Sequence, residues 1–280
     1  MPNNKLLILA LKGFGDAVIV ANMLRHIDSN NFHILTIGRN LSLIKLLLNS
    51  DENISRIIEI DQIPKIYNIK KNIFHIFRLL CEIFIIRSYV KKYIKKGYFP
   101  LIDINSLKNR IIFYGLNPYF LADSNNIYES YQSFFSIPSN LPVEAGLNGN
   151  KFILILPYGS TQDRCIPPYY LEMLYNFLSD NSIKYKVLIH KSQKLIHEAN
   201  DYLLIYNDFS ELIQEIKNAR LLITVDSIGL HLGEFYMIPS CVCSNSWNFF
   251  LPSRILKKDL KFPINNPEPL ISFLFRYYLP

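Results

Sequence analysis

The feature of this sequence that most constrains its fold is an alternation of short, mostly apolar segments with longer amphipathic ones. The apolar segments, such as 5–11 and 152–156, have the length and composition typical of strands buried on both faces of a parallel sheet. The amphipathic segments between them carry apolar residues three and four positions apart, which is helical spacing. The alternation predicts an α/β fold built on doubly wound parallel sheets.

The alternation runs through the sequence twice, and a segment of different composition separates the two passes. In the first pass we predict strands at 5–11, 31–37, 54–60, 101–104 and 111–114, and helices at 16–26, 42–48 and 72–96. In the second pass we predict strands at 152–156, 186–190, 202–205, 221–225 and 240–243, and helices at 168–178, 195–200, 209–218, 228–235 and 267–278. The segment 138–150 between them holds two Pro and two Gly among small polar residues, as linkers do.

These patterns predict the domain organisation. We expect an N-terminal Rossmann-like domain over 1–145 and a C-terminal Rossmann-like domain over 146–262. The remaining segment, 263–280, is expected to form a helix that packs back on the N-terminal domain.

Composition excludes several classes of protein. Half of the 280 residues are apolar, which suffices for two cores, and four Cys are too few for a disulfide scaffold. No run of about 18 uninterrupted apolar residues occurs, so we expect no transmembrane helix. Lys12 and Asp16 interrupt the first apolar run, which argues against a signal peptide. We therefore expect a cytoplasmic protein.

The positive charge is concentrated in one segment. The formal net charge is +7, and 65–97 holds nine Lys or Arg against one acidic residue, Glu82. The rest of the chain is near neutral, which argues against a nucleic-acid binder. Three interpretations of 65–97 stay open: a core helix with a solvated basic end, an interfacial helix on anionic lipid, or a surface for an acceptor with anionic sugars or phosphates.

Three loops follow predicted strands and precede predicted helices. The first contains Gly13, Gly15 and Asp16; the glycines allow a tight turn, and Asp16 would lie in the first helical turn, either as a helix cap or as a functional carboxylate. Its spacing is not the G-x-G-x-x-G of a dinucleotide site. The second, 157–167, offers the hydroxyls of Ser160 and Thr161 and the charge of Arg164 for phosphate oxygens, or it is an ordinary surface loop.

The third loop, 225–231, contains Asp226, Ser227, Gly229 and His231. Asp226 could accept hydrogen bonds from sugar hydroxyls, and the helix start could receive phosphate. His231 lies about one turn into the helix, where it is either a packed core residue or part of a binding site.

Together these segments resemble glycosyltransferase family 9, the ADP-heptose:lipopolysaccharide heptosyltransferases. The matching segments are GFGDAV, PYGSTQDRCIPPYYLEML and DFSELIQEIKNARLLITVDSIGLHLGEFYMIP, in the order found in the family, with YFPLIDINSLKNR as a further match. The resemblance covers most of the chain. It implies a GT-B fold, with two Rossmann-like domains facing each other across a cleft. It also implies transfer of a sugar from a nucleotide-diphosphate donor with inversion and without a bound metal.

The resemblance also implies roles for particular residues. Asp16, with Gly13 and Gly15 in the cleft loop, falls on the catalytic aspartate, which acts as general base on an acceptor hydroxyl. The donor-binding positions fall on Ser160, Thr161, Arg164, Asp226, Ser227, Gly229 and His231. The resemblance assigns the acceptor side to the N-terminal domain, where Asp103 lies, and the donor side to the C-terminal domain.

Four positions depart from the family pattern. Arg164 replaces the usual Lys, Ile228 stands where many members have Gly, and Ile166 replaces an aromatic residue. Lys194 lies roughly where the family has an acidic residue near the nucleoside. These departures leave the donor base open, and the acceptor is the least transferable property.

The sequence therefore predicts an enzyme, with ADP-heptose as default donor, no further cofactor, and a lipopolysaccharide, lipooligosaccharide or other surface-glycan acceptor. We expect it at the inner face of the inner membrane, with peripheral contact through 65–97. Two alternatives stay open. One is a glycosyltransferase of the same fold that uses another nucleotide sugar for capsule or variable glycan; the other is an inactive nucleotide-sugar-binding or membrane-peripheral scaffold. An NAD(P)-dependent Rossmann enzyme is disfavoured, because the first turn lacks the dinucleotide spacing.

Overall fold

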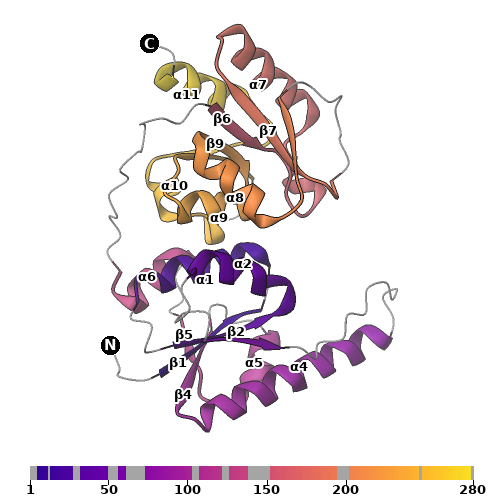
Figure 1. Ribbon diagram of the computed structural model, residues 1–280, viewed down its shortest axis with the longest axis vertical. Helices are drawn as coiled ribbons and strands as arrows, with labels where there is room; N and C mark the ends of the chain where they lie inside the picture. Colours follow the sequence, from indigo (N-terminus) through magenta and orange to yellow (C-terminus); the bar gives the residue numbers. More distant parts are fainter. Residues whose placement is uncertain are drawn as a thin grey trace. The chain divides into compact units, whose positions relative to one another are not determined.

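The chain forms two compact units in a computed structural model (Figure 1). Unit 1 comprises Met1–Ser124 and Glu129–Ser139, and unit 2 comprises Asn125–Tyr128 and Asn140–Pro280. The structure describes residues 5–11, 13–27, 32–49, 56–60, 73–102, 107–121, 126–137, 152–193, 202–245 and 248–278. The division between Ser139 and Asn140 falls in the segment predicted as a linker, which itself lies outside the described residues.

Unit 1 is built on a parallel five-stranded sheet in the order β3-β2-β1-β4-β5. Its strands are β1 (Lys5–Ala10), β2 (Phe32–Ile37), β3 (Ile57–Ile60), β4 (Tyr98–Ile102) and β5 (Tyr119–Phe120). Its helices are α1 (Phe14–Leu24), α2 (Gly38–Leu48), α4 (Ile73–Ile94), α5 (Leu107–Phe113) and α6 (Ile127–Phe135), whose first two residues are assigned to unit 2.

Helices cover both faces of the unit 1 sheet, as apolar strands require. Ile86 and Val90 of α4 and Ile112 of α5 pack on one face against Leu7 and Leu35. Helices α1 and α2 lie on the opposite side of the strands (Figure 1).

Unit 2 is built on a parallel six-stranded sheet in the order β11-β10-β9-β6-β7-β8. Its strands are β6 (Phe152–Leu156), β7 (Tyr185–His190), β8 (Leu203–Tyr206), β9 (Ala219–Val225), β10 (Ser240–Cys243) and β11 (Lys261–Phe262). Its helices are α7 (Pro168–Asp180), α8 (Phe209–Asn218), α9 (Ile228–Phe235), α10 (Ser253–Lys257) and α11 (Glu268–Tyr278), with 3₁₀ turns at Gln162–Arg164 and Asn248–Phe250.

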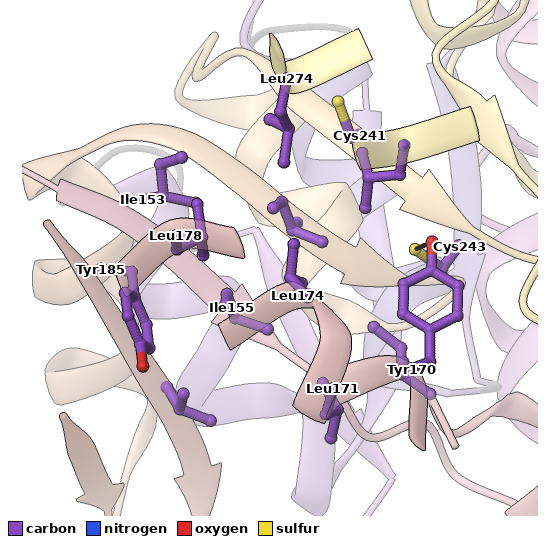
Figure 2. Packing of buried hydrophobic residues seen from close by; sticks show 14 of the residues in the cluster. Ile153, Ile155, Tyr170, Leu171, Leu174, Leu178, Tyr185, Cys241, Cys243 and Leu274 are labelled. Carbon is purple, nitrogen blue, oxygen red and sulfur yellow. Dashed lines mark hydrogen bonds between the residues drawn. The ribbon is translucent and has the colours of Figure 1, made fainter. Parts of the chain in front are cut away.

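The main core of unit 2 lies between its sheet and helices α7 and α11. Figure 2 shows Ile153 of β6 beside Leu178 of α7 and Ile155 of β6 beside Leu174 of α7, with Leu274 of α11 in the same cluster. Leu270 and Leu274 are fully buried there. Helix α11 therefore packs in unit 2, and its expected packing on the N-terminal domain stays a prediction.

Strand order places the predicted loops at equivalent points of the two sheets. In each sheet the first strand lies next to the fourth, β1 beside β4 and β6 beside β9, so the order of connections reverses between them. Ligands of open α/β sheets bind at the carboxyl ends of the strands at this switch point. The turn with Asp16 follows β1, and the loops with Arg164 and Asp226 follow β6 and β9.

Some predicted elements were wrong or missing. Segment 111–114, predicted as a strand, lies in and after α5, because Ile112 and Phe113 are buried against α4 as a helix. Helices α6 and α10 and strands β5 and β11 were not predicted. The predicted helix at 195–200 lies outside the described residues. The other described elements agree with prediction within a few residues at each end.

Candidate functional site

The first loop positions Asp16 in the first turn of α1. The backbone N–H of Gly13 donates a hydrogen bond to Oδ2 of Asp16 over 2.8 Å, and the side chain is half-buried. The carboxylate therefore caps α1, where the positive end of the helix dipole stabilises its charge. Capping and a role in chemistry are compatible, because a carboxylate oxygen carries more than one lone pair.

Two buried side chains fix the end of β1 just before this turn. The carbonyl of Ala10 accepts hydrogen bonds from Oγ1 of Thr36 (3.0 Å) and from Nδ2 of Asn40 (3.1 Å). Both side chains are fully buried. The turn that carries Asp16 thus starts from a rigid point. Asp103, predicted on the acceptor side, lies outside the described residues.

The second loop closes on itself between β6 and α7. The N–H of Ile166 donates to the carbonyl of Pro157 over 2.8 Å, and the N–H of Arg164 donates to the carbonyl of Thr161 over 3.0 Å. A Cβ atom added to Gly159 would lie 2.6 Å from Cβ and 2.7 Å from the carbonyl oxygen of Arg164. Only glycine fits here, so Gly159 is required for the path of the loop that carries Arg164.

The two predicted hydroxyl residues of this loop are exposed. The hydroxyl of Thr161 donates to the carboxylate of Asp163, and this hydrogen bond is the main cause that lowers the pKa of Asp163. Ser160 is also exposed. Ile166 is 1% exposed in the core of unit 2, so the aliphatic residue at this position has a packing role.

Arg164 and Asp226 meet across the switch point of the unit 2 sheet. Nη1 of Arg164 lies 3.8 Å from Oδ2 of Asp226. Asp226 is 6% exposed and Arg164 is 42% exposed, so the guanidinium also faces solvent. A partly exposed pair at this distance contributes little to stability. The chemistry of the pair indicates the kind of ligand that it could bind. The guanidinium of Arg164 can donate two hydrogen bonds to a phosphate, and the neighbouring carboxylate of Asp226 can accept hydrogen bonds from hydroxyl groups of the same ligand.

His231 lies in a buried polar cluster with residues from the chain before the linker. Its Nδ1 is 2.9 Å from the hydroxyl of Tyr128, and the two rings stack with centroids 6.1 Å apart. Nδ2 of Asn126 donates to the carbonyls of Asn248 and Leu251 over 2.9 and 2.8 Å. Burial lowers the pKa of His231 to about 4, although the charge of Asp226 raises it. His231 is therefore neutral near pH 7.

Helix α9 begins close against the sheet. A Cβ on Gly229 would clash with Cδ1 of Leu156, and one on Gly233 would lie 2.5 Å from Cδ1 of Leu222. These two glycines, one turn apart, let α9 approach the strands closely. Ser227 precedes the helix in extended conformation, and its side chain makes no capping hydrogen bond.

A hollow lies at this end of α9. It is small, with about 20 Å³ of space for a water-sized molecule, and is partly open to solvent. Its lining residues are Leu156, Tyr158, Leu188, Gln193, Tyr206, Leu212, Ser227, Ile228 and Gly229. The lining combines aliphatic side chains with the polar groups of Tyr158, Gln193, Tyr206 and Ser227. Among the described residues, no group of three or more His, Cys, Asp or Glu could hold a metal ion.

The structure thus brings together most of the predicted unit 2 residues. Arg164 and Asp226 form a pair, His231 lies within electrostatic reach of Asp226, and Ser227 and Gly229 line the hollow. Ile228, a departure from the family pattern, also lines it, whereas Lys194 lies outside the described residues.

Sequence reasoning missed Tyr128, Asn126 and Gly159. A signal for the first two was present. Asn126 followed three positions later by Glu129, ahead of apolar residues at helical spacing, is a helix-start pattern. The hydrogen bond from the N–H of Tyr128 to Oδ1 of Asn126 is the matching contact.

The architecture of the two units is that of the GT-B glycosyltransferases, two Rossmann-like α/β units in one chain. The chain is similar in structure to Escherichia coli heptosyltransferase WaaC with ADP, at 12% identity and a TM-score of 0.63 over 97% of this chain and 99% of that one. It is also similar to a glycosyl transferase family 9 structure from Veillonella parvula DSM 2008, at 13% identity and a TM-score of 0.57 over 97% and 96% of the two chains.

The same fold occurs in a different class of enzyme. A putative UDP-N-acetylglucosamine 2-epimerase from Listeria monocytogenes matches at 11% identity and a TM-score of 0.56, over 97% of this chain and 87% of that one. No protein-family profile matches the sequence, and no curated protein matches it significantly. At these identities the structural likeness establishes the fold.

Proposed function

We propose that this protein is an inverting, metal-independent glycosyltransferase that binds a nucleotide-diphosphate sugar in unit 2. The observation that carries the proposal is the Arg164–Asp226 pair, 3.8 Å apart at the switch point of a Rossmann-like sheet, next to a hollow at the start of α9. Arg164 would meet the diphosphate, Asp226 the sugar hydroxyls, and the nucleoside would lie against the hollow. The structures of WaaC with ADP and with ADP-2-deoxy-2-fluoro heptose make ADP-heptose the default donor.

Asp16 is the general base in this proposal. It would remove the proton from an acceptor hydroxyl as the oxygen attacks the anomeric carbon of the donor and the nucleoside diphosphate leaves. Its place at the carboxyl end of β1, at the switch point of the unit 1 sheet, supports this role. The acceptor would be a lipopolysaccharide, a lipooligosaccharide or another surface glycan, at the inner face of the inner membrane.

The donor base is tested by thermal shift with ADP, UDP, GDP, CMP and NAD(P). A ligand that binds only the folded state raises the apparent stability. We expect one nucleoside diphosphate to raise the unfolding temperature, ADP if the donor is ADP-heptose. Arg164→Ala should lower the affinity for that nucleotide roughly 10- to 100-fold, because a charge-assisted contact is lost, and Arg164→Lys should lower it less. A shift with NAD(P) alone would contradict the proposal.

The role of Asp16 is tested by Asp16→Asn. The amide can still accept the hydrogen bond of Gly13, so α1 and the donor affinity should be preserved. Sugar transfer should fall by about 10²–10⁴-fold, because the amide cannot take the proton. Asp180→Asn, at the exposed end of α7, is the matched control. Normal turnover by Asp16→Asn would remove Asp16 from the mechanism, and interconversion of nucleotide sugars without an acceptor would favour an epimerase.

A further inference from the structure

Helix α4 presents a face that the core of unit 1 does not cover. Ile86 and Val90 point into the core, whereas Leu80 is 45% exposed and Phe84 is 69% exposed. At 100° per residue, Leu80, Phe84, Lys91 and Lys95 lie within about 60° of one another around the helix, centred roughly 120° from the buried residues. The lysines at 91, 92, 95 and 96 are all exposed. The face is therefore apolar in its middle and basic toward its carboxyl end.

Helix α5 extends this exposed surface. Ile111 is 48% exposed and Tyr114 is 81% exposed, and Arg110 beside them is exposed too. Arg87 of α4 joins the two helices, because its Nη1 and Nη2 donate to the carbonyls of Ile112 and Tyr114, each over 2.7 Å. We call the surface made by Leu80, Phe84, Lys91, Lys95, Arg110, Ile111 and Tyr114 the α4–α5 face.

The charge of the α4–α5 face has one sign. Between positions 73 and 121 the sequence holds eight Lys or Arg and only two acidic residues, Glu82 and Asp103. Of the eight, Arg87 is used inside the unit, as the bridge between α4 and α5. Charge of a single sign beside exposed large apolar side chains marks an interaction surface, and the partner that it complements is anionic and apolar at once.

We propose that the α4–α5 face is a docking surface for an anionic lipid bilayer. Phe84, Tyr114, Leu80 and Ile111 would enter the boundary between headgroups and acyl chains, while the lysines contact the anionic headgroups. No described helix is long and apolar enough to cross a membrane, so the contact is with one leaflet. The face includes none of the residues of the proposed donor and base sites, so its test can fail while the proposed sugar transfer stands; the inference deepens the membrane location that is part of the proposed function.

The test is co-flotation of the full-length protein with phosphatidylcholine vesicles that contain or lack phosphatidylglycerol. We expect binding only to the vesicles with phosphatidylglycerol, and we expect high salt to weaken it because salt screens the charges. Lys91→Ala/Lys95→Ala should lower partitioning about 30-fold, roughly 5-fold for each charge. Phe84→Ser/Tyr114→Ser should lower it about 10-fold or more.

Matched controls lie on unit 2. Phe275 and Tyr277 of α11 are 60% and 71% exposed, and Lys257 and Lys258 are exposed. Phe275→Ser/Tyr277→Ser and Lys257→Ala/Lys258→Ala should leave partitioning unchanged. Circular dichroism melting checks that each variant is folded, which the exposure of the substituted side chains favours.

Three outcomes would overturn the proposal. The first is no binding to anionic vesicles. The second is binding that survives both α4–α5 variants or that the control variants abolish equally. The third is a self-association of the protein, measured by light scattering, that Phe84→Ser removes while no vesicle binding occurs. That result would assign the face to a second copy of the chain.

Discussion

At the scale of single residues, His231 is the clearest case of a side chain whose chemistry is set by burial. It is 4% exposed and loses hydration on folding, which lowers its pKa although Asp226 lies near. The hydroxyl of Tyr128 contacts its Nδ1. A neutral imidazole can serve either as a donor or as an acceptor in that hydrogen bond. The cluster therefore positions His231 without charging it.

This burial predicts a loss of stability in acid. The unfolded chain takes up a proton at His231 near pH 6.5, whereas the folded protein does so only near pH 4. Protons therefore favour the unfolded state as pH falls from 6.5 toward 4, by roughly 1.4 kcal/mol for each pH unit. Between pH 7 and pH 5.5, the free energy of unfolding should fall by about 1 kcal/mol more in the wild type than in His231→Asn, as measured by urea unfolding at each pH.

The control for this prediction is Tyr128→Phe. It removes the hydrogen bond, at a cost of about 1 kcal/mol at every pH, and keeps the buried imidazole. The acid-side loss should therefore persist in Tyr128→Phe. An equal pH dependence in wild type and His231→Asn would show that His231 is not the titrating group.

Residues of the site differ in how far sequence could locate them. Arg164 and Asp226 each come soon after a strand, and β6 and β9 are neighbours in the sheet, so their encounter follows from the predicted topology. The contact between Tyr128 and His231 joins positions 103 apart and does not depend on any strand register. Gly159 was visible in the sequence, but its steric role depends on the backbone path at Arg164.

At the scale of elements, helix α9 shows how a close helix–sheet approach sets the hollow. Gly229 and Gly233 lie on one side of α9, one turn apart. Gly229 faces Leu156, which lines the hollow, whereas Gly233 faces Leu222 and Ser240, which do not line it. A substitution at Gly233 should therefore affect only the packing of α9, whereas one at Gly229 should affect both this packing and the shape of the hollow.

We predict different outcomes for Gly229→Ala and Gly233→Ala. Each added methyl group meets a side chain of the sheet, so each variant should lose about 1–2 kcal/mol of stability, after the gain in helix propensity is counted. Only Gly229→Ala should also weaken nucleotide binding, by several-fold, because Leu156 must move. Titration of both variants with the nucleotide at a temperature where both are folded checks this. Equal weakening in both would mean that the hollow responds to the whole of α9.

Where the sequence analysis predicted the wrong secondary structure, tertiary contacts determine the structure that forms. The run of Ile111, Ile112, Phe113 and Tyr114 has strand-like composition, and short apolar runs do not distinguish strand from helix. Arg87, more than twenty positions earlier, donates to carbonyls at the end of α5 and stabilises the helix there. Periodicity, by contrast, was sufficient for α8, where Asp208 caps a helix with a strong apolar stripe.

At the scale of the whole molecule, the chain consists of two units that each have a sheet and a core of their own. Ligand binding stabilises the cooperative unit that holds the ligand, and regions of a protein can open separately. The residues proposed to bind the donor all lie in unit 2, whereas Asp16 lies in unit 1. A nucleotide should therefore stabilise unit 2, and an acceptor should stabilise unit 1.

Hydrogen exchange should measure the stabilisation of each unit separately. A nucleoside diphosphate at about 100 times its Kd should slow exchange that requires the opening of unit 2 by about 100-fold, a gain of about 2.7 kcal/mol. Amides of β6 and β9 should show this, and those of β1 and β4 should not. Arg164→Ala should remove the effect at the same nucleotide concentration. Equal protection of both sheets would show that the units open together, and protection of β1 and β4 alone would move the nucleotide site to unit 1.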